Sequence, residues 1–277
     1  PGLLLVIGIL GAAFAIVVFY SFLSSAPISG DLSFTLQNYQ KFLTNELYMS
    51  VFWDSFLIAV LVTIGCIFVA FPVAYRIAFM QSEYKNFFLI LCVLPFWINI
   101  VVRTYAWRII LNKNGVLNYV LMDVLGIIEE PLQLIFTEFA VSIGLLHVFL
   151  PFAIIPLYTS IAEIDRSHVE AAKDLGANKL QAFYEVSFPQ ALPGIGASSI
   201  IVFVLAFGSF VIPNLLGGSQ TLMIGNIIAN MFTVNFSWEL GAAIAVVFSV
   251  SILILVYIYN RILGLEELYG ASGGESA

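Results

Sequence analysis

Long apolar runs dominate the chain and predict its secondary structure. Six of them are long enough, or nearly so, to cross ~30 Å of hydrocarbon as helices rising about 1.5 Å per residue. They lie at residues 2–23, 56–78, 87–102, 139–161, 195–212 and 240–263. The third is the shortest and contains Pro95, so we expect a kink there or an extension on one side.

The polar connections between these runs are of two kinds. Three longer connections, at residues 26–54, 103–138 and 213–239, include amphipathic stretches that we expect to lie in the membrane interface. Residues 165–193 differ from them, because they are charged and helix-forming. Residues 270–277 are rich in Gly and Ser, and we expect a disordered tail.

Composition supports a membrane protein with one domain, residues 1–277. Hydrophobic residues make up 61% of the chain and charged residues 10%, whereas soluble domains are roughly half apolar and a quarter charged. The net charge of −7 disfavours nucleic acid as a partner. Cys66 and Cys92 both lie in apolar runs and indicate neither a disulfide nor a metal site. The first residue is Pro1, so we expect the natural N-terminus upstream, and residues 2–23 are too long an apolar run for a signal peptide.

Basic residues give a weak prediction of orientation. With both termini in the cytoplasm, six of the ten Lys and Arg residues lie on the inner side and four on the outer side. The inner six are Arg76, Lys85, Arg166, Lys173, Lys179 and Arg261, and the outer four are Lys41, Arg103, Arg108 and Lys113.

The charged connection contains a pattern with a defined spacing. Glu170, Ala171 and Ala172 open a helix with small residues on one face, and Gly176 can break that helix and let a second one start at a sharp angle. Phe183 and Val186 then return at helical spacing, and Pro189 follows Phe188. We expect a short, stiff helical structure projecting from the membrane.

This pattern resembles the EAA loop of type I ABC importer permeases, with Glu170, Ala171, Ala172, Gly176 and Pro189 in register. The resemblance implies an all-α membrane fold with six transmembrane helices and a cytoplasmic coupling loop at residues 165–193. It also implies a location in the prokaryotic inner membrane, with both termini cytoplasmic. In that family the first short helix docks on a separate ATPase, and here Glu170, Lys173 and Asp174 could pair with it.

The resemblance also implies the partners of the chain. They are a second homologous permease, two ATPase subunits and an extracytoplasmic solute-binding protein. The chain has no G-x-x-x-x-G-K-[ST] phosphate-binding loop, so ATP and Mg are expected at the partner ATPase. We therefore expect a transport subunit with no cofactor of its own, and not an enzyme.

Two further stretches are similar to the first of the two membrane subunits in spermidine/putrescine uptake systems. One comprises residues 94–97 and 102–107, and the other comprises residues 210–218 and 223–226. The sequence departs from those permeases at Glu239, where Pro is usual, and at His147, where an aromatic such as Tyr is usual. Either departure could indicate a different cargo.

A polyamine pathway needs carboxylates for ammonium groups and aromatic rings for the methylene chain. The candidate residues are Asp54, Glu138 and Glu239, the aromatic residues Trp97, Tyr105 and Trp107, and the mid-membrane polar residues His147 and Asn214. The acids could instead be ordinary interface residues and the aromatics an anchoring belt, while His147 could simply satisfy an interhelical hydrogen bond.

Three other functions remain open from the sequence. A secondary transporter or channel would favour ionisable groups in mid-span, and these are nearly absent. A membrane enzyme would need a cluster of His, Asp or Glu on one membrane face, and two histidines in different environments do not make one. Within the transporters, the cargo could be another small cation, an amino-acid-like solute, a metal or an anion.

Overall fold

The computed structural model describes residues 2–25, 33–80 and 83–263, and the regular elements in these ranges are helices, with one isolated β-bridge between Leu23 and Phe34. The α-helices are α1 (Gly2–Ser21), α2 (Gln37–Thr44), α3 (Glu46–Ala78), α4 (Lys85–Val93), α5 (Ile100–Ile110), α6 (Val116–Tyr119), α7 (Glu138–Ala162), α8 (Arg166–Asp174), α9 (Lys179–Ala182), α10 (Phe188–Phe207), α11 (Ile224–Thr233) and α12 (Trp238–Leu263). A 3₁₀ turn, η2 (Leu94–Trp97), follows α4. Three π-helical turns, η3 (Val120–Val124), η4 (Phe183–Ser187) and η5 (Pro213–Gly217), follow α6, α9 and α10.

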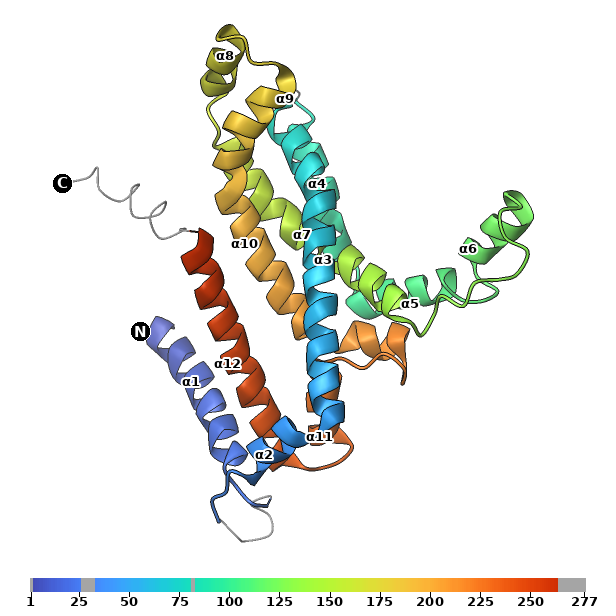
Figure 1. The fold of residues 1–277 in the computed structure, drawn as a ribbon, viewed down its shortest axis with the longest axis vertical. Coiled ribbons are helices and arrows are strands. Elements are labelled where there is room, and N and C mark those ends of the chain that lie inside the picture. The colour runs from blue at the N-terminus through green and yellow to red at the C-terminus, as the bar shows by residue number, and fades with distance from the viewer. Residues whose placement is uncertain (1, 26–32, 81–82, 264–277) are drawn as a thin grey trace, which may run out of the picture.

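The centre of the molecule is a bundle of α3, α7 and α10, which pack against one another along most of their lengths (Figure 1). The hydrophobic effect does not hold helices together in lipid, so their association depends on close packing. Small buried residues allow the backbones to approach closely. These residues are Ala59, Cys66, Ala70 and Ala74 on α3, Ala140, Gly144 and Ala153 on α7, and Ala191, Gly194, Ser198 and Ala206 on α10. Ser198 Oγ donates a hydrogen bond of 2.9 Å to the carbonyl oxygen of Ala153 and so ties α10 to α7.

α10 lies very close to α7 at Gly194. A Cβ atom at this position would lie 2.5 Å from Ser160 Cβ and 3.1 Å from the carbonyl oxygen of Pro156. We therefore expect Gly194→Ala to destabilise the protein by about 1–3 kcal/mol through overpacking, measured as a lower Tm in detergent. Gly11→Ala is the control, because a Cβ there meets nothing within 4 Å. An equal change in Tm for both variants would contradict this description of the interface.

The outer helices α1 and α12 pack against each other beside this bundle (Figure 1). α1 carries exposed apolar side chains along its length, among them Ile7, Leu10 and Phe14. α3 presents a similar outward stripe at helical spacing, formed by Leu57, Leu61, Ile64 and Phe68. Stripes of this kind suit contact with lipid.

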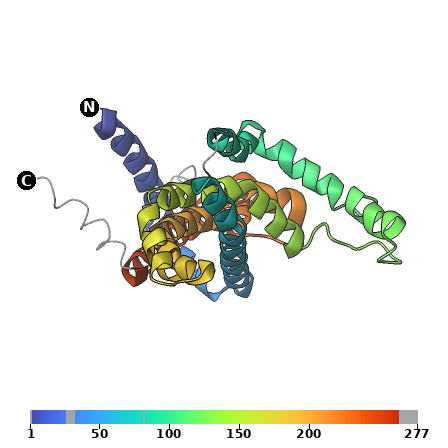
Figure 2. The ribbon, with the colours of Figure 1, turned by 90° about the horizontal axis from the view of Figure 1, so that it is seen from above.

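The segment predicted as the third span is bent. α4 and η2 end at Trp97, α5 begins at Ile100, and the two axes differ in direction by 89°. Pro95 lies in η2, and the side chain of Asn99 caps α5 by accepting the amide N–H of Val101 at 2.8 Å. The expected kink is therefore present, but residues 87–102 are not one straight helix. From α5 to residue 137 the chain forms an arm that projects from the bundle in both views (Figures 1 and 2).

Four helical stretches among the described residues are long and apolar enough to cross a membrane, at residues 46–78, 138–162, 179–207 and 238–261. The bent pair would give a fifth span, and the apolar part of α1, Val6–Ser21, is shorter. The helix that contains the predicted second span begins ten residues earlier than expected, at Glu46. Asn45 Oδ1 caps this start by accepting the amides of Leu47 and Tyr48. The count of six spans thus stays a prediction, and the predicted tail lies outside the described residues.

Candidate functional site

The charged connection forms a helical projection at one end of the bundle, which we call the elbow and define as residues 165–187. It contains α8, α9 and η4, and α8 packs against α9 and η4 (Figure 1, top). α2 and α11 lie at the opposite end of the molecule. The elbow is joined to the bundle at the end of α7 and the start of α10, and Phe183 packs edge to face against Phe71 and Tyr75 of α3.

The first helix of the elbow has a defined start at Asp165. Its Oδ1 accepts the amide N–H of Ser167 at 2.9 Å, which is an N-cap. This hydrogen bond favours the ionised form and lowers the pKa of Asp165 below its ordinary value. The cap is therefore fully formed above the ordinary pKa of an aspartate and is lost as the pH falls through the lowered one.

Removing this cap should loosen α8. We expect Asp165→Ala to speed hydrogen exchange at the amide of Ser167, because this donor loses its side-chain acceptor. Asp165→Asn should keep the exchange slow at neutral pH, since an amide oxygen also caps. Equal exchange in the Ala and Asn variants would show that the cap does not hold the start of α8.

The first helix also has a defined stop, at Gly176. This residue has φ +94°, a left-handed conformation that disfavours residues with a Cβ. The amide of Gly176 donates to the carbonyl of Lys173 at 2.9 Å, and the amide of Ala177 donates to that of Ala172 at 3.0 Å. These two bonds form a Schellman motif. The chain turns there, and Asn178 and Gln181 begin α9 with a capping box.

The outer surface of the elbow combines charge with exposed apolar side chains. Glu170, Ala171, Lys173 and Asp174 are exposed on α8, and Ala172 is half-buried. Leu175 is 90% exposed, and Leu180 and Tyr184 are also largely exposed. Single exposed apolar side chains are common on protein surfaces, but several of them beside charges on one short helical segment favour contact with another molecule. The elbow has the properties of a docking surface for another protein.

At the end of the elbow next to α10, the position of Pro189 differs from the prediction. This residue does not separate a loop from a span. It lies in the first turn of α10, which follows the π-helical turn η4 without a break. α9, η4 and α10 form one helical stretch, Lys179–Phe207, which ends before the predicted limit of residue 212. α9 is thus continuous with α10 through η4.

Three of the residues near the arm meet at one place. The rings of Trp107 on α5 and His147 on α7 meet edge to face at 5.7 Å. Arg103 lies in electrostatic range of His147, and its Nε and Nη1 atoms are shielded from solvent without a hydrogen-bond acceptor among the described residues. Trp107 and His147 are among the pathway candidates from the sequence, whereas Arg103 is not. Its place in a mostly apolar segment was the available signal.

The three acidic candidates lie on separate helices and do not meet. Asp54 is exposed and accepts a hydrogen bond of 3.2 Å from Ser50 Oγ. It lies eight residues, about 12 Å, inside α3 rather than at the end of that helix. Glu138 and Glu239 are in the first turns of α7 and α12. Glu239 Oε2 is shielded from solvent and has no hydrogen-bond partner in the part of the chain that the structure describes.

The remaining candidates are exposed. Trp97 is 90% exposed at the end of η2, and Asn214 is exposed in η5. Tyr105 is also exposed, and the guanidinium carbon of Arg108 lies 5.9 Å from its ring centroid. The structure therefore brings together Trp107 and His147, while the other aromatic and acidic candidates remain apart.

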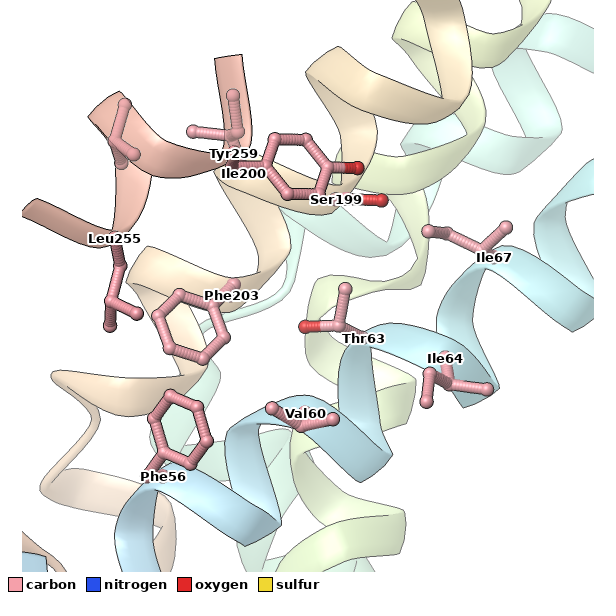
Figure 3. A pocket seen from close by; sticks show the side chains of 11 residues that line it. Phe56, Val60, Thr63, Ile64, Ile67, Ser199, Ile200, Phe203, Leu255 and Tyr259 are labelled. Carbon is pink, nitrogen blue, oxygen red and sulfur yellow. The ribbon is translucent and has the colours of Figure 1, made fainter. Parts of the chain in front are cut away.

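A separate cleft of about 300 Å³ lies between α3, α10 and α12 (Figure 3). Phe56 and Phe203 meet across it edge to face at 5.7 Å. The hydroxyl groups of Thr63 and Ser199 donate to carbonyl oxygens of their own helices, those of Ala59 and Ile195. No charged residue lines the cleft. Its chemistry suits an apolar occupant and not a cation.

A bundle of apolar helices with a projecting, well-capped helical elbow defines a membrane component that works together with another protein. The family model of the binding-protein-dependent transport system inner membrane component matches residues 49–264. The chain belongs to this family and is a membrane component of an ABC importer, not an enzyme. This membership favours the ATP-driven importer over the secondary transporter considered above.

Curated relatives of this chain are permease proteins of transport systems. A spermidine/putrescine transport system permease protein of Haemophilus influenzae, PotB, is 38% identical over 227 residues, which are 82% of this chain and 79% of that protein. PotB of Escherichia coli is 37% identical over 228 residues, 82% of each chain. The inner membrane ABC transporter permease protein YdcU of Escherichia coli is 31% identical over 264 residues, 90% of this chain and 82% of that one.

Solved structures of a bacterial alginate ABC transporter share the fold. One, of the importer of that acidic polysaccharide, has a TM-score of 0.67 and 15% identity over 94% of this chain and 96% of its own. Another, with an alginate pentasaccharide-bound periplasmic protein, has a TM-score of 0.66 and 16% identity over 81% of both chains. The predicted all-α ABC permease fold is confirmed.

Proposed function

We propose that this chain forms half of the translocation pathway of a polyamine importer and that its elbow is the attachment point of a separate ATPase. The observation that supports the proposal most is α8, a helix fixed at Asp165 and Gly176 with an exposed outer face. A helix that only linked two spans would need neither fixed ends nor exposed leucines. A helix that transmits motion needs both a rigid body and a contact surface.

Coupling follows from how the elbow is rooted. α8 and α9 are joined by the turn at Gly176, and α9 continues through η4 into α10. When two ATPase subunits close on ATP and Mg, a docked α8 moves with them, and the ends of α7 and α10 follow. The bundle then opens outward, which is alternating access driven by differential binding of two states. In this chain Glu170, Lys173 and Asp174 pair with the ATPase, and Ala171 and Ala172 allow close approach.

The polyamine cargo is proposed from the relatives and from the residue types at the end opposite the elbow. Two of the relatives described above are spermidine/putrescine permeases. Asp54, Glu138 and Glu239 supply carboxylates for ammonium groups, and Trp97, Tyr105 and Trp107 supply rings for methylene chains. His147 and Asn214 add polar groups to the same pathway.

The full importer in this proposal contains this chain as a single six-span domain, a homologous second permease, two ATPase subunits and a solute-binding protein outside the membrane. The elbow and both termini lie in the cytoplasm. The cofactors ATP and Mg bind to the ATPase subunits, and this chain makes and breaks no bonds.

Uptake of labelled spermidine into proteoliposomes that contain the complete importer tests the proposal. We expect uptake that requires both ATP and the binding protein and is inhibited by unlabelled putrescine. ATP-dependent uptake of a different solute that spermidine does not inhibit would overturn the cargo. Uptake without any ATPase subunit would overturn the coupling.

A further inference from the structure

A groove of about 760 Å³ lies between the last turns of α7 and the first turns of α10. Its walls come from Pro156 to Ile164 on one side and from Pro189 to Ala197 on the other. Gly194 forms the floor, where its amide donates to Ser160 Oγ at 3.2 Å. None of the residues that line the groove is a lysine or an arginine, and one, Glu163, is an acid.

The polar groups of the groove gather on one face of α7. Thr159 and Ser160 precede Glu163 by four and three residues, so the three side chains share a helix face. Glu163 is exposed and has no ion pair or hydrogen bond through its carboxylate among the described residues. Gln190 offers an exposed amide from the α10 wall.

These groups can accept hydrogen bonds that the fold does not use. The Thr159 hydroxyl donates to the carbonyl of Ile155 at 3.0 Å, which leaves lone pairs on its oxygen. Ser160 Oγ accepts one bond from Gly194 and keeps a second lone pair. With the Glu163 carboxylate they supply acceptors for the three N–H bonds of a primary ammonium group.

The prolines shape the same groove. Pro193 removes the amide that would pair with the carbonyl of Pro189, because a proline has no N–H. Pro156 frees the carbonyl of Phe152 in α7 in the same way. Pro156, Pro189 and Pro193 line the groove, and their fixed φ angles stiffen its walls.

The groove also lies between the two roots of the elbow. Glu163 and Ile164 immediately precede Asp165, which caps α8, and Pro189 and Gln190 follow η4. Both walls of the groove are therefore continuous with the elbow.

We propose that this groove binds the terminal ammonium group of a linear polyamine at the elbow side of the pathway, and that movement of the elbow releases it. The inference rests on the proposed function and adds an exit site with a named carboxylate. Glu163 supplies the charge, Thr159, Ser160 and Gln190 supply polar acceptors, and the proline rings contact the methylene chain.

Spermidine uptake by the complete importer in proteoliposomes tests the site. We expect Glu163→Gln to lower spermidine turnover about fivefold, because one partly exposed charge-assisted contact is lost, and Glu163→Asp to retain most of it. ATPase activity stimulated by the binding protein should not change. Glu129→Gln is the matched control, since Glu129 is exposed in the arm, outside both the groove and the elbow.

Cysteine modification tests occupancy directly. In a Cys92→Ser background, Gln190→Cys would be modified by a cationic methanethiosulfonate, while Cys66 is fully buried. We expect spermidine to slow this modification at least about threefold, and Glu163→Gln to abolish the protection.

Two results would overturn the exit site. In the first, the Glu163→Gln importer takes up spermidine as fast as wild type, and spermidine does not protect Gln190→Cys from modification. In the second, the ATPase subunits protect Gln190→Cys from modification without spermidine. If wild type transports spermidine in those experiments, the proposed function stands without the exit site. If wild type transports no spermidine at all, the proposed function itself fails.

Discussion

Gly176→Val should uncouple ATP hydrolysis from uptake while the protein still inserts into the membrane. We expect uptake to fall about tenfold or more, with ATP hydrolysis by the assembled complex largely retained. Gly176 has φ +94°, and valine in the left-handed region is a conformational outlier. The strain is about 1–2 kcal/mol from the backbone alone, and relieving it would change the angle between α8 and α9.

Two further variants separate a changed angle between α8 and α9 from a lost contact with the ATPase. Gly176→Asn should retain most uptake, because asparagine tolerates the left-handed conformation. A Cβ at position 176 meets nothing within 4 Å, so neither variant adds a clash inside this chain. Glu170→Ala, an exposed change on α8, should also uncouple, but by loss of a partner contact. Unchanged uptake in both Gly176→Val and Glu170→Ala would refute the coupling role.

Neutralising the three acids at the end opposite the elbow should weaken the uptake of cations. For Asp54→Asn, Glu138→Gln and Glu239→Gln together we expect the KM for spermidine to rise roughly tenfold, since each partly exposed charge contributes about 0.2–1 kcal/mol. The kcat should change less, because these residues lie far from the elbow (Figure 1).

The single variants rank the three positions. Glu239 should have the largest effect, because its Oε2 is shielded and has no partner in the described chain, whereas Asp54 is already paired with Ser50. The effect of the triple variant should also decrease with salt, as expected for exposed charges. An unaffected KM in the triple variant would remove the acidic residues from the pathway.

The elbow is the part of the molecule that the sequence predicts best. The predicted stop at Gly176 is present, but α8 begins at Arg166, four residues before the predicted opening at Glu170, because Asp165 caps it there. Asp165 and Asn178 also act locally, because each caps the helix that follows it. Local rules suffice for α8 because its cap and its stop use residues that are close in sequence.

Elsewhere the sequence is less decisive. Pro95 permits either a kinked span or a break, and the 3₁₀ turn with the Asn99 cap produces a bend of 89°. The early start of α3 is set by Asn45, a cap that lies in a polar region and carries no hydropathy signal. Hydropathy locates apolar runs but not the ends of helices that extend beyond them.

The exit groove could not be predicted from the sequence. Glu163 and Gln190 are 27 positions apart and face one groove only because α7 and α10 pack closely at Gly194. Arg103 likewise lies in a recognisable run of residues, but its unpaired guanidinium atoms become evident only when α5 lies beside α7. Both depend on contacts between helices and not on local spacing.

Site-specific cross-linking tests the central claim most directly. Leu175, at the end of α8, is 90% exposed. With Leu175→Cys in the assembled importer, a short bifunctional thiol reagent should link this chain to a cysteine introduced on the surface of the ATPase subunit, and ATP should change the yield. Lys113→Cys, exposed in the arm, should not link. Efficient linking from position 113 with none from position 175 would contradict the account.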